Sequence, residues 1–336
     1  MRSIRATFLA AIMLATCPAL AKAEVKVVAS IKPVHSLVAA VMQGVGTADL
    51  IVDGAGSPHT YALKPSQARQ LQDADLVFWM GHDLEAFLEK PIAGIAKKAL
   101  SVELMDSQGL SKISFRKGGD FDDHHHDDAR HESHEDHEDH KDDEDHAEHE
   151  REHADNSHDA HDHEEDAFNP HVWLDPVNAT AMVREIAKQL SQADPANAPS
   201  YNANASRIVA RLNDLIAEID AKLAPVKGRG YVVFHDAYQY FETRFDMMAV
   251  GAIAVSPDVL PGAERVRNLQ DKIRRLDASC VFSEPQFEPK LVTTVVENTT
   301  AATGILDPLG ASIEPGPELY FALIRTIAGS MKDCLS

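Results

Sequence analysis

Short apolar runs alternate with helical patterns in the first third of the chain. Runs of four to eight apolar residues are typical of buried strands, and apolar positions recurring every three or four residues are typical of helices. The strand-like runs are residues 25–30, 49–54 and 74–81, and the helical patterns cover 33–44, a short segment from Lys64 and 84–96. This alternation predicts a parallel sheet with helices packed outside it.

The same alternation returns in the last third of the chain. The strand-like runs there are 231–235, 247–254, 279–285 and 302–308, and the helical patterns cover 237–244, 263–275, 288–298 and 317–332. We therefore predict an α/β fold with two Rossmann-like lobes, each built on a parallel sheet.

A long amphipathic helix is predicted between these blocks, at residues 202–225. No strand accompanies it, so it is expected to join the lobes. Its apolar stripe is Ile208, Leu212, Leu215, Ile216, Ile219 and Leu223. The predicted organisation is an N-terminal lobe at 24–119 and 167–201, the linking helix, and a C-terminal lobe at 226–336.

Residues 120–166 differ from the rest of the chain. They hold 23 acidic and 3 basic residues, so this segment accounts for nearly all of the net charge of −21. High charge and low hydrophobicity predict a segment that is disordered without metal. The remaining chain has no basic stripe for phosphates, which argues against a nucleic acid partner.

Thirteen of the eighteen histidines lie in this acidic segment. A solvated spacer needs no imidazole, whereas imidazole and carboxylate together suit divalent metals, so we predict an accessory metal-binding loop. Its candidate ligands are His124, His125, His126, His131, His134, His137, His140, His146, His149, His153, His158, His161 and His163.

The N-terminus has the pattern of a secretory signal peptide at residues 1–23. Arg2 and Arg5 precede a short apolar core, and Ala21-Lys22-Ala23 predicts cleavage after Ala23. The apolar core is too short for a membrane helix. A lipoprotein signal at Cys17 is the less favoured alternative, because Thr16 is a poor neighbour for a lipidated cysteine.

Cleavage would leave two cysteines, Cys280 and Cys334. In an exported chain two cysteines are most simply one disulfide. A thiolate zinc site is the weaker alternative, because no C-x-x-C pair is present.

Three histidines outside the loop occupy positions where ligands are expected. His59 and His235 follow predicted strands, as does Asp307, and His171 lies in a turn rich in proline and asparagine. In open α/β sheets, ligands bind beyond the carboxyl ends of the strands. Three imidazoles with a carboxylate or water suit Zn²⁺. Each histidine could instead be a capped or partly buried loop residue.

The whole mature chain resembles the periplasmic zinc-binding proteins of ABC importers, the ZnuA type. The matching stretches are VVASIKPVHSLV, GSPHTYALKPSQARQLQDADLVFWMG, NPHVWLDP, FHDAYQYF, FSEPQF and ILDPLG, with the histidine-rich insertion just before NPHVWLDP. The resemblance implies two α/β lobes joined by one long helix, metal in the cleft between them, and His59, His171 and His235 as ligands. It also implies a disulfide between Cys280 and Cys334.

The resemblance further implies zinc as the metal and an inner-membrane ABC permease as the partner, and we expect a monomer. Manganese-selective relatives usually carry glutamate where His235 stands. Some relatives have glutamate before the first histidine, but Pro58 stands there in this chain. The fourth ligand is therefore Asp307, which we favour, a water or a loop residue.

Two other functions fit the same residues. Three histidines and an open position also describe a catalytic zinc, with Glu284 and Asp236 as candidate bases in a hydrolase or lyase. No HExxH motif outside residues 120–166 supports this, and we predict that the chain is not an enzyme. Alternatively, the loop could store zinc as a passive buffer.

Overall fold

The structure is a computed structural model, and it describes residues 24–116, 121, 168–254, 261–276 and 278–336. The predicted signal peptide and the thirteen loop histidines lie outside these residues.

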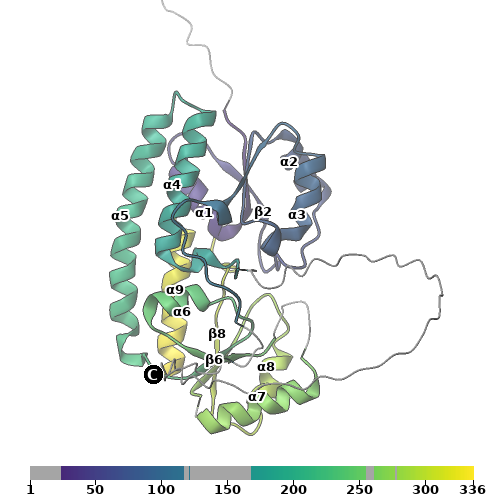
Figure 1. The fold of residues 1–336 in the computed structure, drawn as a ribbon, viewed down its shortest axis with the longest axis vertical. Coiled ribbons are helices and arrows are strands. Elements are labelled where there is room, and N and C mark those ends of the chain that lie inside the picture. Colours follow the sequence, from purple (N-terminus) through teal and green to yellow (C-terminus); the bar gives the residue numbers. More distant parts are fainter. Residues whose placement is uncertain (1–23, 117–120, 122–167, 255–260, 277) are drawn as a thin grey trace, which may run out of the picture.

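Two four-stranded parallel sheets form the centres of the two lobes (Figure 1). The first has the order β2-β1-β3-β4 and the second the order β6-β5-β7-β8, so both lobes use one arrangement. The strands are β1 Val27–Ile31, β2 Ala48–Val52, β3 Leu76–Trp79, β4 Leu100–Glu103, β5 Tyr231–Val233, β6 Ala249–Ala252, β7 Cys280–Ser283 and β8 Ala302–Ile305.

The predicted strands are confirmed, and one more is present. Every residue of β1 and β3 is buried, as expected for inner strands covered on both faces. The hydrophobic pattern does not reveal β4, an edge strand in which only Val102 is buried. A strand with one buried residue leaves little hydrophobic pattern to detect.

The helices cover the sheets and connect the lobes (Figure 1). Those of the N-terminal part are α1 Lys32–Val41, α2 Pro65–Asp73, α3 His82–Gly94 and α4 Pro176–Ala193. The remaining ones are the long α5 Ala198–Leu223, then α6 Gln239–Phe245, α7 Ala263–Leu276, α8 Lys290–Val296 and α9 Leu319–Leu335.

The long helix α5 runs along one side of the molecule past both lobes (Figure 1). Its predicted apolar stripe is buried, except that Ile216 is only partly buried. The helix starts at Ala198, four residues before the predicted start, because Pro199 is compatible with a first turn. The prediction of one long helix linking two lobes is confirmed.

Helix α9 packs against elements of both lobes, including β8 of its own lobe. It contacts α5 and α1, and the Tyr320 amide donates to the Ser36 hydroxyl of α1 at 2.9 Å. Arg325 of α9 also pairs with Glu218 of α5. One continuous apolar core therefore extends from β1 to the C-terminal helix.

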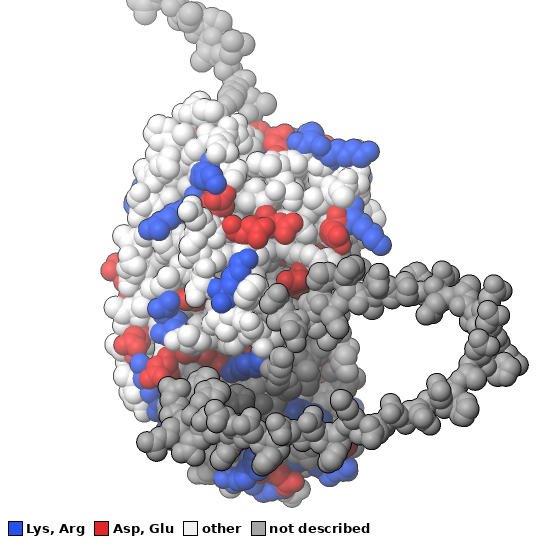
Figure 2. Space-filling view, in the orientation of Figure 1, with Lys and Arg blue, Asp and Glu red and all other residues white. Residues whose placement is uncertain are grey.

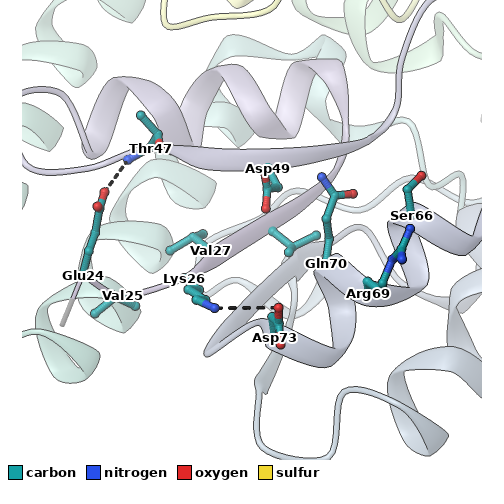
Figure 3. Close-up of a pocket in the computed structure, with 11 residues that line it drawn as sticks. Glu24, Val25, Lys26, Val27, Thr47, Asp49, Ser66, Arg69, Gln70 and Asp73 are labelled. Atoms are coloured by element: carbon teal, nitrogen blue, oxygen red, sulfur yellow. Dashed lines mark hydrogen bonds and ion pairs between the residues drawn. The ribbon is translucent and has the colours of Figure 1, made fainter.

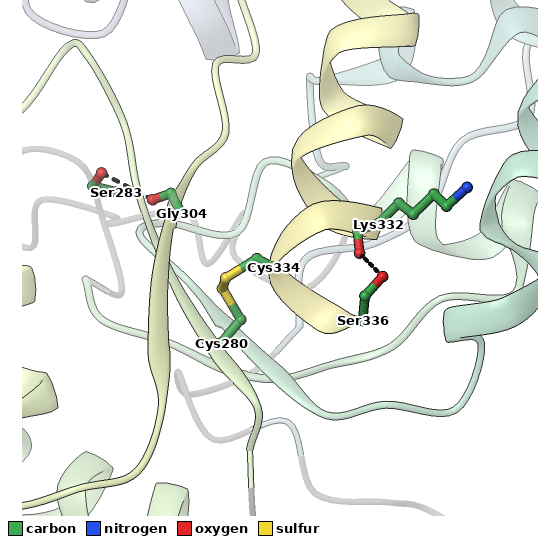
Figure 4. The surroundings of a disulfide bond; sticks show 6 residues. All are labelled: Cys280, Ser283, Gly304, Lys332, Cys334 and Ser336. Atoms are coloured by element: carbon green, nitrogen blue, oxygen red, sulfur yellow. Dashed lines mark hydrogen bonds between the residues drawn. A yellow bond between two sulfur atoms is a disulfide. The ribbon is translucent and has the colours of Figure 1, made fainter.

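The predicted disulfide between Cys280 and Cys334 is present (Figure 4). It joins β7 to the last turn of α9, with the two Cα atoms 5.9 Å apart. Gly304 of β8 lies beside it, and a Cβ atom there would be 3.3 Å from the Cys334 sulfur and 2.6 Å from the Phe282 ring. A side chain at this position would displace the bridge and the ring.

Acidic and basic side chains are interspersed on the face of the described residues in Figure 2. None of the helices among the described residues combines the length and the apolar character needed to cross a bilayer.

Candidate metal site

The structure brings three sequence-distant histidines together. His59 lies in the turn after β2, His235 follows the end of β5, and His171 begins the short 3₁₀ turn Val172–Leu174. One nitrogen from each ring lies within 4.8 Å of the others. In the part of the chain that the structure describes, no other three His, Cys, Asp or Glu residues form such a group.

The spacing of the rings suits a tetrahedral ion. His171 Nε2 lies 3.4 Å from His59 Nε2 and 3.4 Å from His235 Nε2. With zinc–nitrogen bonds of 2.0–2.1 Å, two ligands of a tetrahedral centre are about 3.4 Å apart. The observed distances therefore match two edges of a zinc coordination tetrahedron.

Hydrogen bonds orient two of the rings so that Nε2 is free. His171 Nδ1 donates to the side-chain oxygen of Asn169 at 2.7 Å, and Asn169 uses its amide nitrogen to donate to the Asp236 carbonyl at 2.8 Å. His235 Nδ1 donates to Glu284 Oε1 at 2.7 Å. A proton on Nδ1 leaves the Nε2 lone pair for a metal.

The environment keeps His59 and His171 neutral. Burial lowers the pKa of His59 to about 3, and the nearby His235 ring contributes. Burial also lowers the pKa of His171 well below its usual value, helped by His235 and His59. Burial raises the pKa of Glu284, although the adjacent His235 opposes this rise. Neutral imidazole is the form that binds metals.

Apolar groups form much of the wall of the site. The cavity around the three rings is small, and its wall includes Pro58, Trp173, Phe287 and Leu309. The Trp173 ring centre lies 5.1 Å from that of His171, and the Phe287 ring lies edge-on to His235 at 5.7 Å. Aromatic rings therefore pack directly against His171 and His235.

The structure does not bring Asp307 into the three-histidine group. Its carboxylate accepts hydrogen bonds from the Gln286 side chain at 2.9 Å and from the amides of Leu309, Gly310 and Ala311. The carboxylate thereby orders the loop after β8. Its role as fourth ligand stays a prediction.

The groups that support the ligand rings are not apparent from the sequence pattern. It predicts Glu284 only as a candidate base and makes no prediction for Asn169. Asn169 stands two residues before His171 in NPHVW, and Glu284 follows a strand in SEP. These supporting groups could have been predicted from two features of the sequence: a polar residue beside a predicted ligand, and a polar residue directly after a buried strand.

The other two histidines among the described residues have separate roles. His35 contacts the Ala48 carbonyl through Nε2 at 3.0 Å, which places it against β2. His82 forms an exposed pair with Glu89 at 3.1 Å.

A cavity of about 510 Å³ lies near the amino ends of β1 and β2 (Figure 3). Charges of both signs line it, including a Lys26–Asp73 pair at 3.8 Å. It has no histidine or cysteine in its wall and is separate from the three-histidine site.

Two α/β lobes with parallel sheets on one long helix, with two buried imidazoles and one partly buried imidazole between them, define a metal-binding solute-binding protein. The family model for ZnuA, described as zinc-uptake complex component A periplasmic, matches residues 27–334. The chain belongs to this family.

Curated relatives agree over the full length. High-affinity zinc uptake system protein ZnuA of Brucella suis is 52% identical, with all of both chains covered. The protein of the same name from Paracoccus denitrificans is 42% identical over 94% of this chain and 93% of its own. The Yersinia pestis protein is 33% identical over 93% and 92%.

Solved structures share the fold. A crystal structure of ZnuA covers 92% of this chain and 100% of its own at 22% identity and a TM-score of 0.69. A zinc-bound ZnuA mutant lacking residues 138–173 in its own numbering gives 0.71 at 21% identity, covering 94% and 99%. A manganese-bound periplasmic metal-binding protein from candidatus Liberibacter asiaticus gives 0.68 at 20% identity, covering 93% and 100%.

Proposed function

We propose that this protein captures zinc with high affinity in the periplasm and delivers it to the permease of an ABC importer. The observation that carries the proposal is the group of three imidazoles, whose Nε2 atoms have the spacing of zinc ligands. The names of the full-length relatives support zinc uptake as the process.

In this proposal His59, His171 and His235 each bind zinc through Nε2. Asn169 and Glu284 hold two of the rings through their Nδ1 atoms. The fourth ligand is Asp307, a water or a loop residue, and the Asp307 carboxylate already accepts hydrogen bonds from Gln286 and from backbone amides.

Zinc is favoured over manganese because the three available ligands are nitrogens. Manganese prefers carboxylate and other oxygen ligands, whereas imidazole suits zinc, copper and nickel. Replacing His235 with glutamate is therefore expected to shift preference towards manganese. Competition between the two ions on the same protein would test this.

The rest of the chain supports export and capture. We propose that residues 1–23 are a signal peptide cleaved after Ala23 and that the mature protein is a monomer. The histidines of residues 120–166 collect zinc loosely and raise its concentration near the site, which makes transfer effectively intramolecular. Zinc is the transported substrate, and no catalytic step is proposed.

Zinc titration in competition with a chelator of known affinity tests the assignment. The mature protein and a variant lacking residues 120–166 should both keep one tight site, and His59→Ala/His171→Ala/His235→Ala should lose it. His82→Ala, an exposed histidine outside the group, is the matched control. A triple variant that kept one tight zinc would favour the passive buffer. Ester hydrolysis lost in His235→Ala would favour a zinc hydrolase.

A further inference from the structure

Arg116 connects the two lobes beside the metal site. It precedes residues 117–120, outside the described ranges, and reaches α6 of the other lobe. Its guanidinium pairs with both carboxylate oxygens of Asp236, and its Nη1 donates to Glu242 at 2.8 Å. The Phe121 ring packs on the guanidinium at 3.6 Å. Asp236 and Glu242 are only 11% and 5% exposed, so this is a largely desolvated cluster.

The cluster is joined to two of the three rings. Asp236 directly follows His235, and its carbonyl accepts the amide of Asn169 at 2.8 Å. Asn169 in turn accepts from His171 Nδ1 at 2.7 Å. A continuous path of bonds therefore leads from Arg116 through Asp236 and Asn169 to His171.

A second set of hydrogen bonds crosses the same boundary between the lobes. The Tyr240 hydroxyl of α6 accepts the Ile113 amide at 2.9 Å and donates to the Asn169 carbonyl at 2.8 Å. Ser114 and Phe168 form an isolated antiparallel bridge, which holds the segments of Ile113 and Asn169 side by side. Both segments contact Tyr240 of α6, five residues after His235 in the chain.

We propose that Arg116 is a positioning residue for the metal site, fixing the separation of His171 from His235 across the lobe boundary. A planar, bidentate guanidinium restricts direction as well as distance. This matters because His171 is carried by the N-terminal lobe and His235 by the C-terminal lobe. The inference rests on the proposed zinc site and adds a residue that touches neither ligand ring.

Arg116→Met and Arg116→Lys test this role on the full mature protein. Chelator competition measures the zinc affinity of both variants. The affinity should fall about tenfold in Arg116→Met, the size of effect seen when outer partners of metal ligands are lost. It should fall by less in Arg116→Lys, because lysine keeps the positive charge. The visible spectrum of bound Co²⁺ should change in Arg116→Met, because it reports ligand geometry. Arg325→Met, which removes an exposed ion pair remote from the site, should change neither.

If Arg116 only stabilises the fold, zinc affinity and the Co²⁺ spectrum should not change in its variants. Folded Arg116→Met with unchanged zinc affinity and an unchanged Co²⁺ spectrum would overturn the proposal. If Arg116→Met does not fold, Arg116→Met/Asp236→Asn/Glu242→Gln removes all three charges and leaves none unpaired. Weaker zinc binding by that variant would support the proposal, and binding equal to the unmodified protein would refute it. Failure of the unmodified protein to bind zinc would instead reject the proposed function.

Discussion

His171 and His235 are held by chemically different acceptors, a neutral amide and a buried carboxylate. Glu284 accepts from His235 at 2.7 Å and is completely enclosed, whereas Asn169 contributes no charge to its ring. A carboxylate on Nδ1 raises the basicity of the imidazole at Nε2. We therefore expect His235 to be the stronger zinc ligand of the two.

Replacement of Glu284 with glutamine tests that difference. Glu284→Gln keeps the shape and a hydrogen-bond acceptor but removes the charge. Zinc affinity should fall roughly 10–100-fold, the usual range for loss of an outer partner. Chelator competition measures this, with the exposed Glu89→Gln as control. Unchanged affinity in Glu284→Gln would mean that the carboxylate charge contributes nothing at His235.

The low pKa of His59 predicts acid sensitivity of the metal-free protein. Between pH 6.5 and about 3 the unfolded chain binds a proton at His59 that the folded protein does not. Stability is therefore complete above pH 6.5 and falls as the pH drops, by about 2 kcal/mol at pH 5.

Urea unfolding at pH 7, 6 and 5, with a chelator present, measures the free energy of unfolding of the unmodified protein and of His59→Gln. The difference between the two proteins at each pH gives the contribution of His59. The comparison is needed because Glu85 acts in the opposite direction. Burial raises the pKa of Glu85 to about 7, so its contribution to stability increases as the pH falls towards 4.5. Parallel pH profiles for the two proteins would contradict the prediction.

Sequence position pointed to the three histidines that the structure groups, because His59 and His235 follow strands and the family motifs surround all three. It could not identify their supports. Whether Glu284 contacts His235 or stays in solvent depends on how β5 and β7 pair, 49 residues apart in the chain. The partners of Asp307 depend equally on a loop conformation that no residue pattern specifies.

At the scale of elements, the hydrophobic pattern identified most of the strands and helices described here. The strand that it missed is β4, in which only Val102 is buried. Strand β8 is no more buried, but its apolar run continues to the buried Leu306. The pattern also did not reveal that α9 packs on α1, because an amphipathic helix shows which face is buried but not against which neighbour.

The disulfide should stabilise the junction between β7 and α9. Removing it in Cys280→Ala/Cys334→Ala should lower the free energy of unfolding by about 2–4 kcal/mol. Zinc affinity should change by less than about threefold, because the bridge contacts no ligand residue. Denaturant unfolding with a chelator present and zinc competition measure the two quantities. A large loss of zinc affinity with little loss of stability would contradict this prediction that the disulfide stabilises the fold and not the metal site.

At the scale of the whole molecule, the shared core limits motion between the lobes. Helices α5 and α9 both cross from one lobe to the other, and Lys32 donates to the carbonyls of Ala311 and Ile313 across the boundary. Wide hinge closure would expose this packed surface to water. We expect small rearrangements around the site instead.

Small-angle X-ray scattering of the protein lacking residues 120–166 tests this expectation. A compact chain of this size has a radius of gyration of about 18 Å. Zinc should change the measured value by less than about 1 Å, the result for local ordering rather than domain closure. A larger contraction would show that the lobes hinge despite the shared helices.

The position of α9 also has a consequence for biosynthesis. In the proposed export the chain crosses the membrane N-terminus first, yet α1 and α5 are covered by α9, the last helix described. The first lobe therefore keeps an apolar surface uncovered until translocation is almost complete. A chaperone that binds apolar surfaces would therefore have the most time to bind this protein before residue 319 emerges.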